Sequence, residues 1–217
     1  MKFEISDRAK NIIEWILCIV IAVVLAILVR YFIGTPTIVK QPSMFPTLKE
    51  NQRLILSRIG TNMLKQIPER GEIVTFEAPV SNYIPPAEAD LENPVAPYDD
   101  TDRGFFHNFT YNVLGIGKIN YIKRVIGLPG EHVKIENGKV YINGEELDEP
   151  YLQDGVVTDS LDGAFTDITV PEGCVFLMGD NRSQSTDCRR FGCIPLDKLE
   201  GKVVLRFWPL NTFGTVE

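Results

Sequence analysis

An apolar run near the N-terminus constrains this chain more than any other feature. From residue 11 to residue 33 the sequence reads NIIEWILCIVIAVVLAILVRYFI, interrupted only by Glu14 and Arg30 near its ends. As a helix this run would be about 35 Å long at roughly 1.5 Å per residue, enough to cross a lipid bilayer. Its uncharged part, Trp15 to Val29, would span only about 22 Å at the same rise, so Glu14 and Arg30 must lie near the interfaces. We predict a short tail and a transmembrane anchor over residues 1–35.

A cleavable signal peptide is the alternative explanation of this run. Such a segment ends in a small-x-small cleavage site, whereas here the run passes straight into VRYFIGTPTIV. We therefore favour an uncleaved anchor that crosses the cell membrane once. Lys2, Arg8 and Lys10 precede the run, and Arg30 and Lys40 follow it. Under the positive-inside rule this balance weakly favours a cytoplasmic N-terminus.

Charge and cysteine usage exclude other classes of protein. The 217-residue chain has a net charge of −7, which argues against nucleic acid as a partner because phosphate binding needs clustered Lys and Arg. The four cysteines, Cys18, Cys174, Cys188 and Cys193, show no Cys-x-x-Cys spacing, and Cys18 lies inside the apolar run. This pattern predicts no disulfide framework and no metal site, although one bridge, such as Cys188 with Cys193, remains open. We expect no cofactor.

Beyond the anchor the sequence predicts a mainly β domain over residues 36–217. Short apolar runs such as RLILS, EIVTF, KVYIN and KVVLRFW alternate with Gly, Pro and Asn, a pattern typical of strands and turns. Asn137-Gly138 is a strong hairpin signal and Asn143-Gly144 marks the next turn, within a hairpin-containing region at 131–165. We expect twisted, largely antiparallel sheets and leave open whether they close against one another.

Residues 80–118 depart from this pattern. Their first half is rich in proline and acidic residues and is expected to form an exposed loop. The second half ends in FFHNFTYNVLGIGK, whose aromatic side chains either pack on the core or lie against lipid head groups. We favour packing on the core.

Histidine offers no obvious catalytic base. The chain has only His107 and His132, and neither stands near a Ser or Cys motif, so a Ser-His-Asp arrangement is not expected. The sequence also lacks the HExxH, Gly-x-Ser-x-Gly and P-loop motifs. If the chain is a hydrolase, another base must serve.

Three segments stand out instead. Ser43 lies between two prolines in QPSMFPTL, residues 41–48, where a serine is ordinarily a turn residue. Lys123 lies in YIKRVIGLPG, residues 121–130, and strand alternation puts it on the same face as Tyr121 and Val125. The third segment is GDNRSQSTDCRRFG, residues 179–192. Taken singly, these are a turn, a strand lysine and a polar loop.

Together the three segments resemble the type I signal peptidase family. That family carries Ser-Met-x-Pro-Thr-Leu after a membrane anchor, then Tyr-Ile-Lys-Arg-Val-Ile-Gly-Leu-Pro-Gly, then Gly-Asp-Asn-Arg-x-x-Ser-x-Asp-Ser-Arg-x-x-Gly. The segment RGEIV at 70–74 is also similar to the family, and FWPL at 207–210 is similar to the tail of its Gram-positive members. The resemblance covers nearly the whole chain except residues 80–118, which look like an insertion.

The resemblance implies a membrane-bound serine endopeptidase with a Ser-Lys dyad, in which Ser43 attacks the scissile carbonyl and Lys123 removes its proton. It implies secretory preproteins as substrates, cut after a small residue at an Ala-x-Ala type site, and an extracytoplasmic catalytic domain. A free lysine has a pKa near 10.4, so only about one in a thousand would be neutral at pH 7.4. Burial must therefore lower the pKa of Lys123 if it is to act as a base.

The resemblance also implies supporting roles. Ser185 would hydrogen-bond Lys123, and Asp187 would pair with Arg189 or with Arg182 to brace the site, beside Asp180 of the same motif. Some family members have a serine two residues before the nucleophile that helps to hold the oxyanion, but here that residue is Gln41. The oxyanion donors expected are therefore the backbone N–H of Ser43 and the side-chain amide of Gln41. Cys188 replaces the second serine of the motif, and Glu131 stands where the family commonly has Asp.

Two other functions remain as alternatives. One is a related Ser-Lys protease such as a self-cleaving regulator. The other is a catalytically impaired, membrane-anchored module that binds signal peptides, suggested by Gln41 and by the insertion. Such a binding module would need neither Ser43 nor Lys123, so their presence favours the peptidase.

Overall fold

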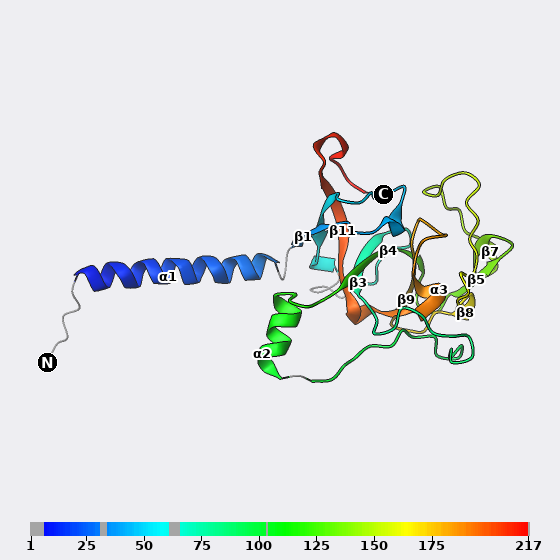
Figure 1. Cartoon of the computed structure of the whole chain (residues 1–217), viewed down its shortest axis with the longest axis horizontal. Coiled ribbons are helices and arrows are strands. Elements are labelled where there is room, and N and C mark those ends of the chain that lie inside the picture. Colours follow the sequence, from blue (N-terminus) through cyan, green and yellow to red (C-terminus); the bar gives the residue numbers. More distant parts are fainter. Residues whose placement is uncertain (1–6, 31–33, 61–65, 103, 217) are drawn as a thin grey trace.

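The computed structural model describes residues 7–30, 34–60, 66–102 and 104–216. Its first element is the helix α1 (Asp7–Leu28), which projects from the β domain as an isolated rod (Figure 1). Its segment Lys10–Leu28 is long and apolar enough to cross a membrane, and none of it is buried inside the protein. An apolar helix with no protein packed around it requires another apolar surrounding, as expected for an anchor.

Among the described residues, seven strands form one sheet. Their spatial order is β1 (Gly34–Ile38), β2 (Arg53–Ser57), β11 (Leu199–Trp208), β3 (Ile73–Glu77), β4 (Asn120–Gly127), β9 (Cys174–Met178) and β10 (Ile194–Pro195). Every neighbouring pair is antiparallel, and β11 carries register shifts against both β2 and β3. Such irregularities increase the local twist, and the strands turn strongly across the sheet (Figure 1).

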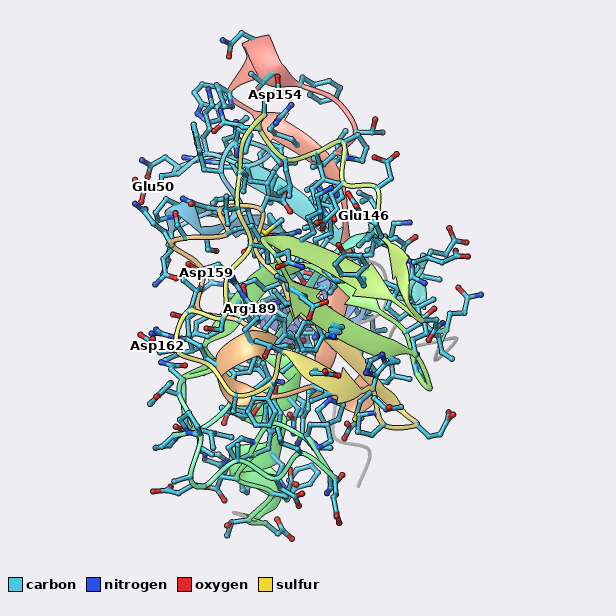
Figure 2. The ribbon with its side chains drawn as sticks, turned by 90° about the vertical axis from the view of Figure 1, so that its right-hand side faces the viewer. Glu50, Glu146, Asp154, Asp159, Asp162 and Arg189 are labelled. Atoms are coloured by element: carbon cyan, nitrogen blue, oxygen red, sulfur yellow. The ribbon has the colours of Figure 1, made fainter. Side chains whose placement is uncertain are left out.

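A smaller sheet lies at the end of the domain away from α1, onto which Figure 2 looks. Within the described ranges its order is β7 (Glu145–Glu146), β6 (Lys139–Ile142), β5 (His132–Glu136) and β8 (Asp167–Thr169), again antiparallel. The prediction of twisted, antiparallel sheets is confirmed. Both sheets are open rather than closed, because each order runs from one edge strand to another.

Both predicted turns of this region are present. Asn137 and Gly138, which join β5 to β6, have φ angles of 53° and 81°, and Asn143 and Gly144 have 53° and 87°. A two-residue turn of this type requires positive φ at both central positions, which Asn and Gly adopt most readily. The hairpin register follows from these local preferences.

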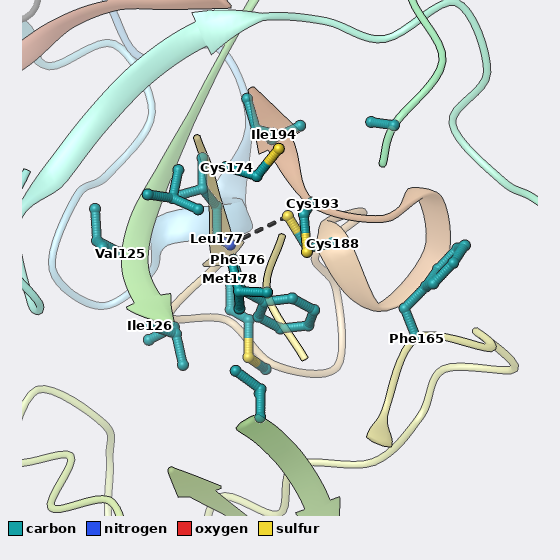
Figure 3. Close-up of a cluster of buried hydrophobic side chains, with 14 of the residues drawn as sticks. Val125, Ile126, Phe165, Cys174, Phe176, Leu177, Met178, Cys188, Cys193 and Ile194 are labelled. Carbon is teal, nitrogen blue, oxygen red and sulfur yellow. Dashed lines mark hydrogen bonds between the residues drawn. The ribbon is translucent and has the colours of Figure 1, made fainter. Parts of the chain in front are cut away.

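The main core lies between the two sheets and is centred on β9, whose five residues are all buried. Figure 3 shows this cluster, with Phe176 and Leu177 beside Val125 and Ile126 of β4. Cys174, Cys188 and Cys193 are buried there as free thiols, so the question left open about a bridge is answered in the negative. The Leu177 N–H donates to Cys188 Sγ at 3.1 Å (Figure 3).

The short helices lie in the connections. They are η2 (Pro42–Met44), α2 (Phe105–Asn108), the π-helical turn η4 (Phe109–Val113), α3 (Cys188–Phe191), η5 (Leu196–Lys198) and η6 (Leu210–Thr212). Of these, η2 lies within the first sequence motif, 41–48, and α3 lies within the third, 179–192.

The segment 80–118 corrects two expectations. Its acidic half is not wholly exposed, because Ala96 is buried and its N–H donates to the Cys193 carbonyl at 2.9 Å, while the Cys193 N–H donates to the Pro94 carbonyl at 2.7 Å. Packing of the aromatic half on the core is wrong for Phe105 and Phe106, whose exposed fractions are 78% and 82%. The contact with the domain is made instead by Tyr111, whose hydroxyl donates to Glu77 Oε1 at 2.9 Å.

Candidate active site

Ser43 is held in a single tight turn just after the first strand. It occupies the middle of η2, where Pro42 sets the helical φ angle of the first position, and its side chain is almost buried. The following Met44 is fully buried in a second, smaller core. The Asn181 N–H donates to the Ser43 carbonyl at 3.0 Å, and Asn181 Nδ2 donates to the Pro42 carbonyl at 3.2 Å. The turn is thereby fastened to the third motif.

Lys123 reaches this turn from the middle of β4. Its Nζ lies 2.9 Å from Ser43 Oγ and also donates to the Ile122 carbonyl at 3.1 Å. The two residues are 80 positions apart in sequence. Lys123 is only 3% exposed, and the Tyr121 ring lies beside it, 5.6 Å from Nζ to the ring centroid.

Burial shifts the ionisation of this lysine. Desolvation disfavours the ammonium and lowers the pKa of Lys123 from 10.5 to about 8. The carboxylates of Asp187 and Asp180 act in the opposite sense, while the guanidinium of Arg189 lowers the pKa further. As a result about one lysine in ten is neutral at pH 7, instead of about one in three thousand without the shift.

Asp187 and Arg189 form a fully buried ion pair behind the lysine. Arg189 Nε and Nη2 each donate to one carboxylate oxygen of Asp187 at 2.9 Å, and the Gly179 N–H donates to the second oxygen at 3.1 Å. Asp187 is also the N-cap of α3, accepting from the Arg189 N–H. Burial opposes the charge of this carboxylate, but Arg189 and the N–H donors outweigh it, so the pKa of Asp187 lies below its ordinary value.

Arg182 does not share this pair. Its guanidinium forms a salt bridge with Glu149 and donates to Thr158 Oγ1 at 2.6 Å. Arg182 Nε donates to the Gly179 carbonyl at 3.1 Å, and its own carbonyl accepts from Arg189. Of the two partners left open for Asp187, the structure therefore selects Arg189.

Asp180 has its own partners, which sequence reasoning missed. Arg124 donates to both of its oxygens, at 2.9 and 2.8 Å, and Thr47 Oγ1 donates at 2.6 Å. Arg124 also donates to the Gly71 carbonyl at 2.7 Å. Thr47 lies in the first motif, four residues after Ser43, and Arg124 lies in the second motif, next to Lys123. Their places in these motifs were the sequence signal that could have identified them as partners of Asp180.

Ser185 and Gln41 lie close to Ser43 and Lys123, but neither side chain forms a hydrogen bond with them. Ser185 is buried and close enough to Asp187 to help lower the pKa of that carboxyl. Its hydroxyl nevertheless makes no hydrogen bond of normal geometry in the described part of the chain, so the expected bond to Lys123 is absent. Gln41 is exposed at the rim beside Ser43, and its side chain does not cap the turn.

An open groove leads to Ser43 and Lys123. It has a volume of about 320 Å³ and is lined by residues from β1 and the chain after it, Thr37 to Gln41, and by Lys118 to Lys123 on the opposite side. Within the described ranges, β1 pairs only with β2, and β9 pairs with β4 only from Arg124 onward. Two strand edges with unpaired main-chain groups therefore border the groove. No group of three or more His, Cys, Asp or Glu that could hold a metal ion is found among the described residues.

Comparisons with known proteins identify the family to which the chain belongs. The family model described as "Signal peptidase, peptidase S26" matches residues 12–208. "Signal peptidase I S" of Bacillus subtilis (strain 168) is 35% identical over 222 residues, covering 97% of each chain. "Signal peptidase IB" of Staphylococcus aureus (strain COL) is 33% identical over 219 residues, covering 94% of this chain and 93% of the relative.

Among solved structures, a signal peptidase I from Enterococcus faecalis V583 is 27% identical. It covers 62% of this chain and 95% of its own, with a TM-score of 0.39. The family match and the two curated relatives span nearly the whole sequence. The chain therefore belongs to the signal peptidase family, peptidase S26.

Proposed function

We propose that this protein is a membrane-bound serine endopeptidase that removes N-terminal signal peptides from secretory preproteins, with Ser43 as nucleophile and Lys123 as general base. The single observation that carries the proposal is the 2.9 Å distance between Lys123 Nζ and Ser43 Oγ, which belong to two buried residues that line the groove. A hydroxyl is a weak nucleophile unless a base accepts its proton, and a buried lysine with a pKa of about 8 supplies that base.

In the proposed reaction, the neutral amine of Lys123 accepts the proton as Ser43 Oγ attacks the scissile carbonyl. The resulting ammonium returns this proton to the leaving amine, which leaves an acyl ester on Ser43. Neutral again, Lys123 takes a proton from water as the water oxygen attacks the ester. The ammonium then returns this proton to Ser43 Oγ as the ester bond breaks, which releases the new carboxyl terminus and restores the hydroxyl. The backbone N–H of Ser43 and the Gln41 amide donate to the oxyanion. The Asp187–Arg189 pair holds the pocket without reacting.

The substrate would bind as an added strand in the groove. The unpaired edges of β1 and of Asn120–Ile122 offer main-chain donors and acceptors on both sides of an extended peptide. Main-chain bonds of this kind supply affinity for any sequence, so the choice of residue comes from side-chain pockets. A cut after a small residue, as at an Ala-x-Ala site, fits a peptide pressed close to the buried Ser43.

The membrane orientation is part of the same proposal. A single crossing by α1, with a cytoplasmic N-terminus, places the catalytic domain outside the cytoplasm, where translocated precursors emerge. The charges around α1 give weak support through the positive-inside rule. Confinement to the membrane plane raises the effective concentration of enzyme toward membrane-bound precursors.

The test is cleavage of a precursor with one Ala-x-Ala site by detergent-solubilised protein. The wild type should cut once, after the second Ala, and Ser43→Ala and Lys123→Ala should leave the precursor intact. Ser183→Ala and Lys139→Ala, at exposed positions, are matched controls that should cut like the wild type. Equal cutting by Ser43→Ala or Lys123→Ala would reject the dyad, and binding without cutting by the wild type would indicate the impaired module instead.

A further inference from the structure

Three phenylalanines of the 80–118 segment form an exposed cluster, which we call the aromatic patch: Phe105, Phe106 and Phe109. Their exposed fractions are 78%, 82% and 38%. The rings contact one another, with centroids 5.8 Å apart for Phe105 and Phe106 and 6.4 Å apart for Phe105 and Phe109. Large apolar rings gathered on a surface cost free energy in water, so the patch needs an apolar partner.

The opposite face of this helical segment holds the patch in place. Tyr111 donates to Glu77 at the end of β3, and the Lys118 side chain forms salt bridges with Glu77 and Glu200. At the other end, Asp102 accepts from the Gly104 N–H and from Asn108 Nδ2, both at 2.9 Å. The segment is thus amphipathic, with its polar contacts toward the domain and its rings pointing outward.

The patch adjoins the end of the membrane helix. A Cβ on Gly115, in the turn that follows η4, would lie 3.1 Å from the Arg30 guanidinium, and Arg30, Tyr111 and Gly115 line a common cavity. Figure 1 shows α2 on the side of the domain from which α1 projects. Arg30 is the charged residue expected at the membrane interface. The aromatic patch therefore lies at the level where α1 leaves the bilayer.

We propose that the aromatic patch is a second membrane contact, which inserts into the boundary between head groups and acyl chains of the leaflet beside the catalytic domain. The neighbouring acidic residues Asp99, Asp100 and Asp102 favour the apolar boundary over anionic head groups as the binding partner. Interfacial segments of this type bury their apolar face about 5–10 Å into the boundary. Ile116 and Ile119, both more than 60% exposed, continue this surface toward the groove.

The consequence concerns the height and tilt of the groove. A second membrane contact, added to α1, would fix which side of the domain faces the lipid. Ile119 and Lys118 also line the groove, so the segment that carries the patch continues into one wall of the groove. The inference depends on α1 crossing the membrane, but it does not depend on the proposed peptidase chemistry.

The experiment uses the full-length protein in bilayers that contain lipids brominated along the acyl chain, which quench nearby tryptophan. Phe106→Trp is introduced after both native tryptophans are removed by Trp15→Phe and Trp208→Phe. The matched control is Glu145→Trp in the same background, at an exposed site in β7 at the far end of the domain. A third protein keeps Trp15 alone and reports on α1. Circular dichroism checks the fold of each.

The proposal expects bromolipid quenching of Trp at position 106 and of Trp15, with the tryptophan at 145 unaffected. Quenching at position 106 should be strongest with bromines near the head-group end of the chain, and no weaker in zwitterionic than in anionic lipid. If Trp15 is quenched while position 106 behaves like position 145, α1 is in the bilayer and the patch proposal is overturned. Quenching that needs anionic lipid and disappears in high salt would overturn the apolar mode of contact.

A second variant links the patch to activity. Replacement of all three phenylalanines by serine should lower cleavage of a membrane-inserted precursor several-fold and leave cleavage of a short soluble peptide in detergent unchanged. Equal loss on both substrates would indicate damage to the site instead. A protein that cleaves neither substrate before the replacement would contradict the proposed function but not the quenching result.

Discussion

Gly179 touches the turn that carries Ser43 so closely that a Cβ at this position would lie 2.4 Å from the carbonyl oxygen of Ser43. It would also lie 2.2 Å from Ser185 Oγ. The Gly179 N–H meanwhile donates to Asp187. One glycine at the end of β9 thus brings the first and third motifs into contact, and only a residue without a side chain permits that approach.

Gly179→Ala should therefore displace the turn that carries Ser43, because the clashing carbonyl belongs to the main chain. A displacement near 1 Å at a reacting group lowers kcat/KM by about 100-fold, and overpacking typically costs about 1–3 kcal/mol of stability. Peptide cleavage and thermal unfolding measure the two effects. Gly60→Ala is the control, since among the described residues a Cβ there meets only the Gln66 side chain, at 3.4 Å. Unchanged kcat/KM in Gly179→Ala would contradict the contact.

The rate should depend on pH through Lys123. With a pKa of about 8 and the neutral amine as the active form, kcat/KM should rise about tenfold per pH unit below pH 8 and level off above it. A soluble peptide substrate assayed from pH 6 to pH 10 gives the profile. An inflection above pH 10 would mean that the lysine is solvated in the folded protein.

The free energy of unfolding should also depend on pH, because burial lowers the pKa of Lys123 in the folded state and makes its protonated form costly there. Below pH 8 both the folded and unfolded states hold the proton, so the folded state bears the full cost of a buried ammonium. Between pH 8 and about 10.5 only the unfolded state binds it, so stability should rise by up to about 3 kcal/mol. Lys123→Met removes this dependence and should be inactive yet at least as stable as the wild type at pH 7. Denaturant unfolding at several pH values measures both, and a parallel pH dependence in the two proteins would contradict the prediction.

The pairing of Asp187 with Arg189 can be separated from that of Arg182 with Glu149 by double-mutant cycles. Removing one partner of a buried pair typically costs about 3–5 kcal/mol. Within each pair the coupling should exceed about 1 kcal/mol, as it does for residues in direct contact. The cross-cycle between Asp187 and Arg182 should give a smaller value. The cycles are built from the unfolding free energies of variants in which Asp is replaced by Asn, and Glu or Arg by Gln. A larger coupling between Asp187 and Arg182 than between Asp187 and Arg189 would contradict the assigned pairing.

Gln41→Ala tests the proposed second oxyanion donor. Loss of such a donor lowers kcat by about 10²–10³-fold, with little change in KM because the bond strengthens only in the transition state. Stability should hold, since Gln41 is exposed and its side chain does not cap the turn. Glu50→Ala, at an exposed position outside the groove, is the control. A kcat within a few-fold of the wild type would leave Ser43 N–H as the donor without Gln41.

Some features of the fold could be predicted because they depend on residues close together in the chain. The hairpin turns at Asn137-Gly138 and Asn143-Gly144 require positive φ angles that these residues adopt locally. The expectation for the aromatic half of segment 80–118 failed because aromatic composition favours a core but does not say which face of a short helix meets it. Tyr111 faces the domain and Phe106 does not, and that orientation depends on Glu77, far away in sequence.

By itself, the sequence determined the apolar anchor, the antiparallel strands with their turns, and the motifs that single out Ser43 and Lys123. Only the tertiary structure decided that Asp187 pairs with Arg189 and not Arg182, that Asp180 forms a salt bridge with Arg124, and that the phenylalanines of the aromatic patch are exposed. The physical reason is the separation along the chain of the residues that determine each feature. Turn geometry and membrane-spanning length are properties of a short stretch of chain, whereas the partner of a buried charge is selected by whichever distant groups the folded sheets bring within hydrogen-bond distance.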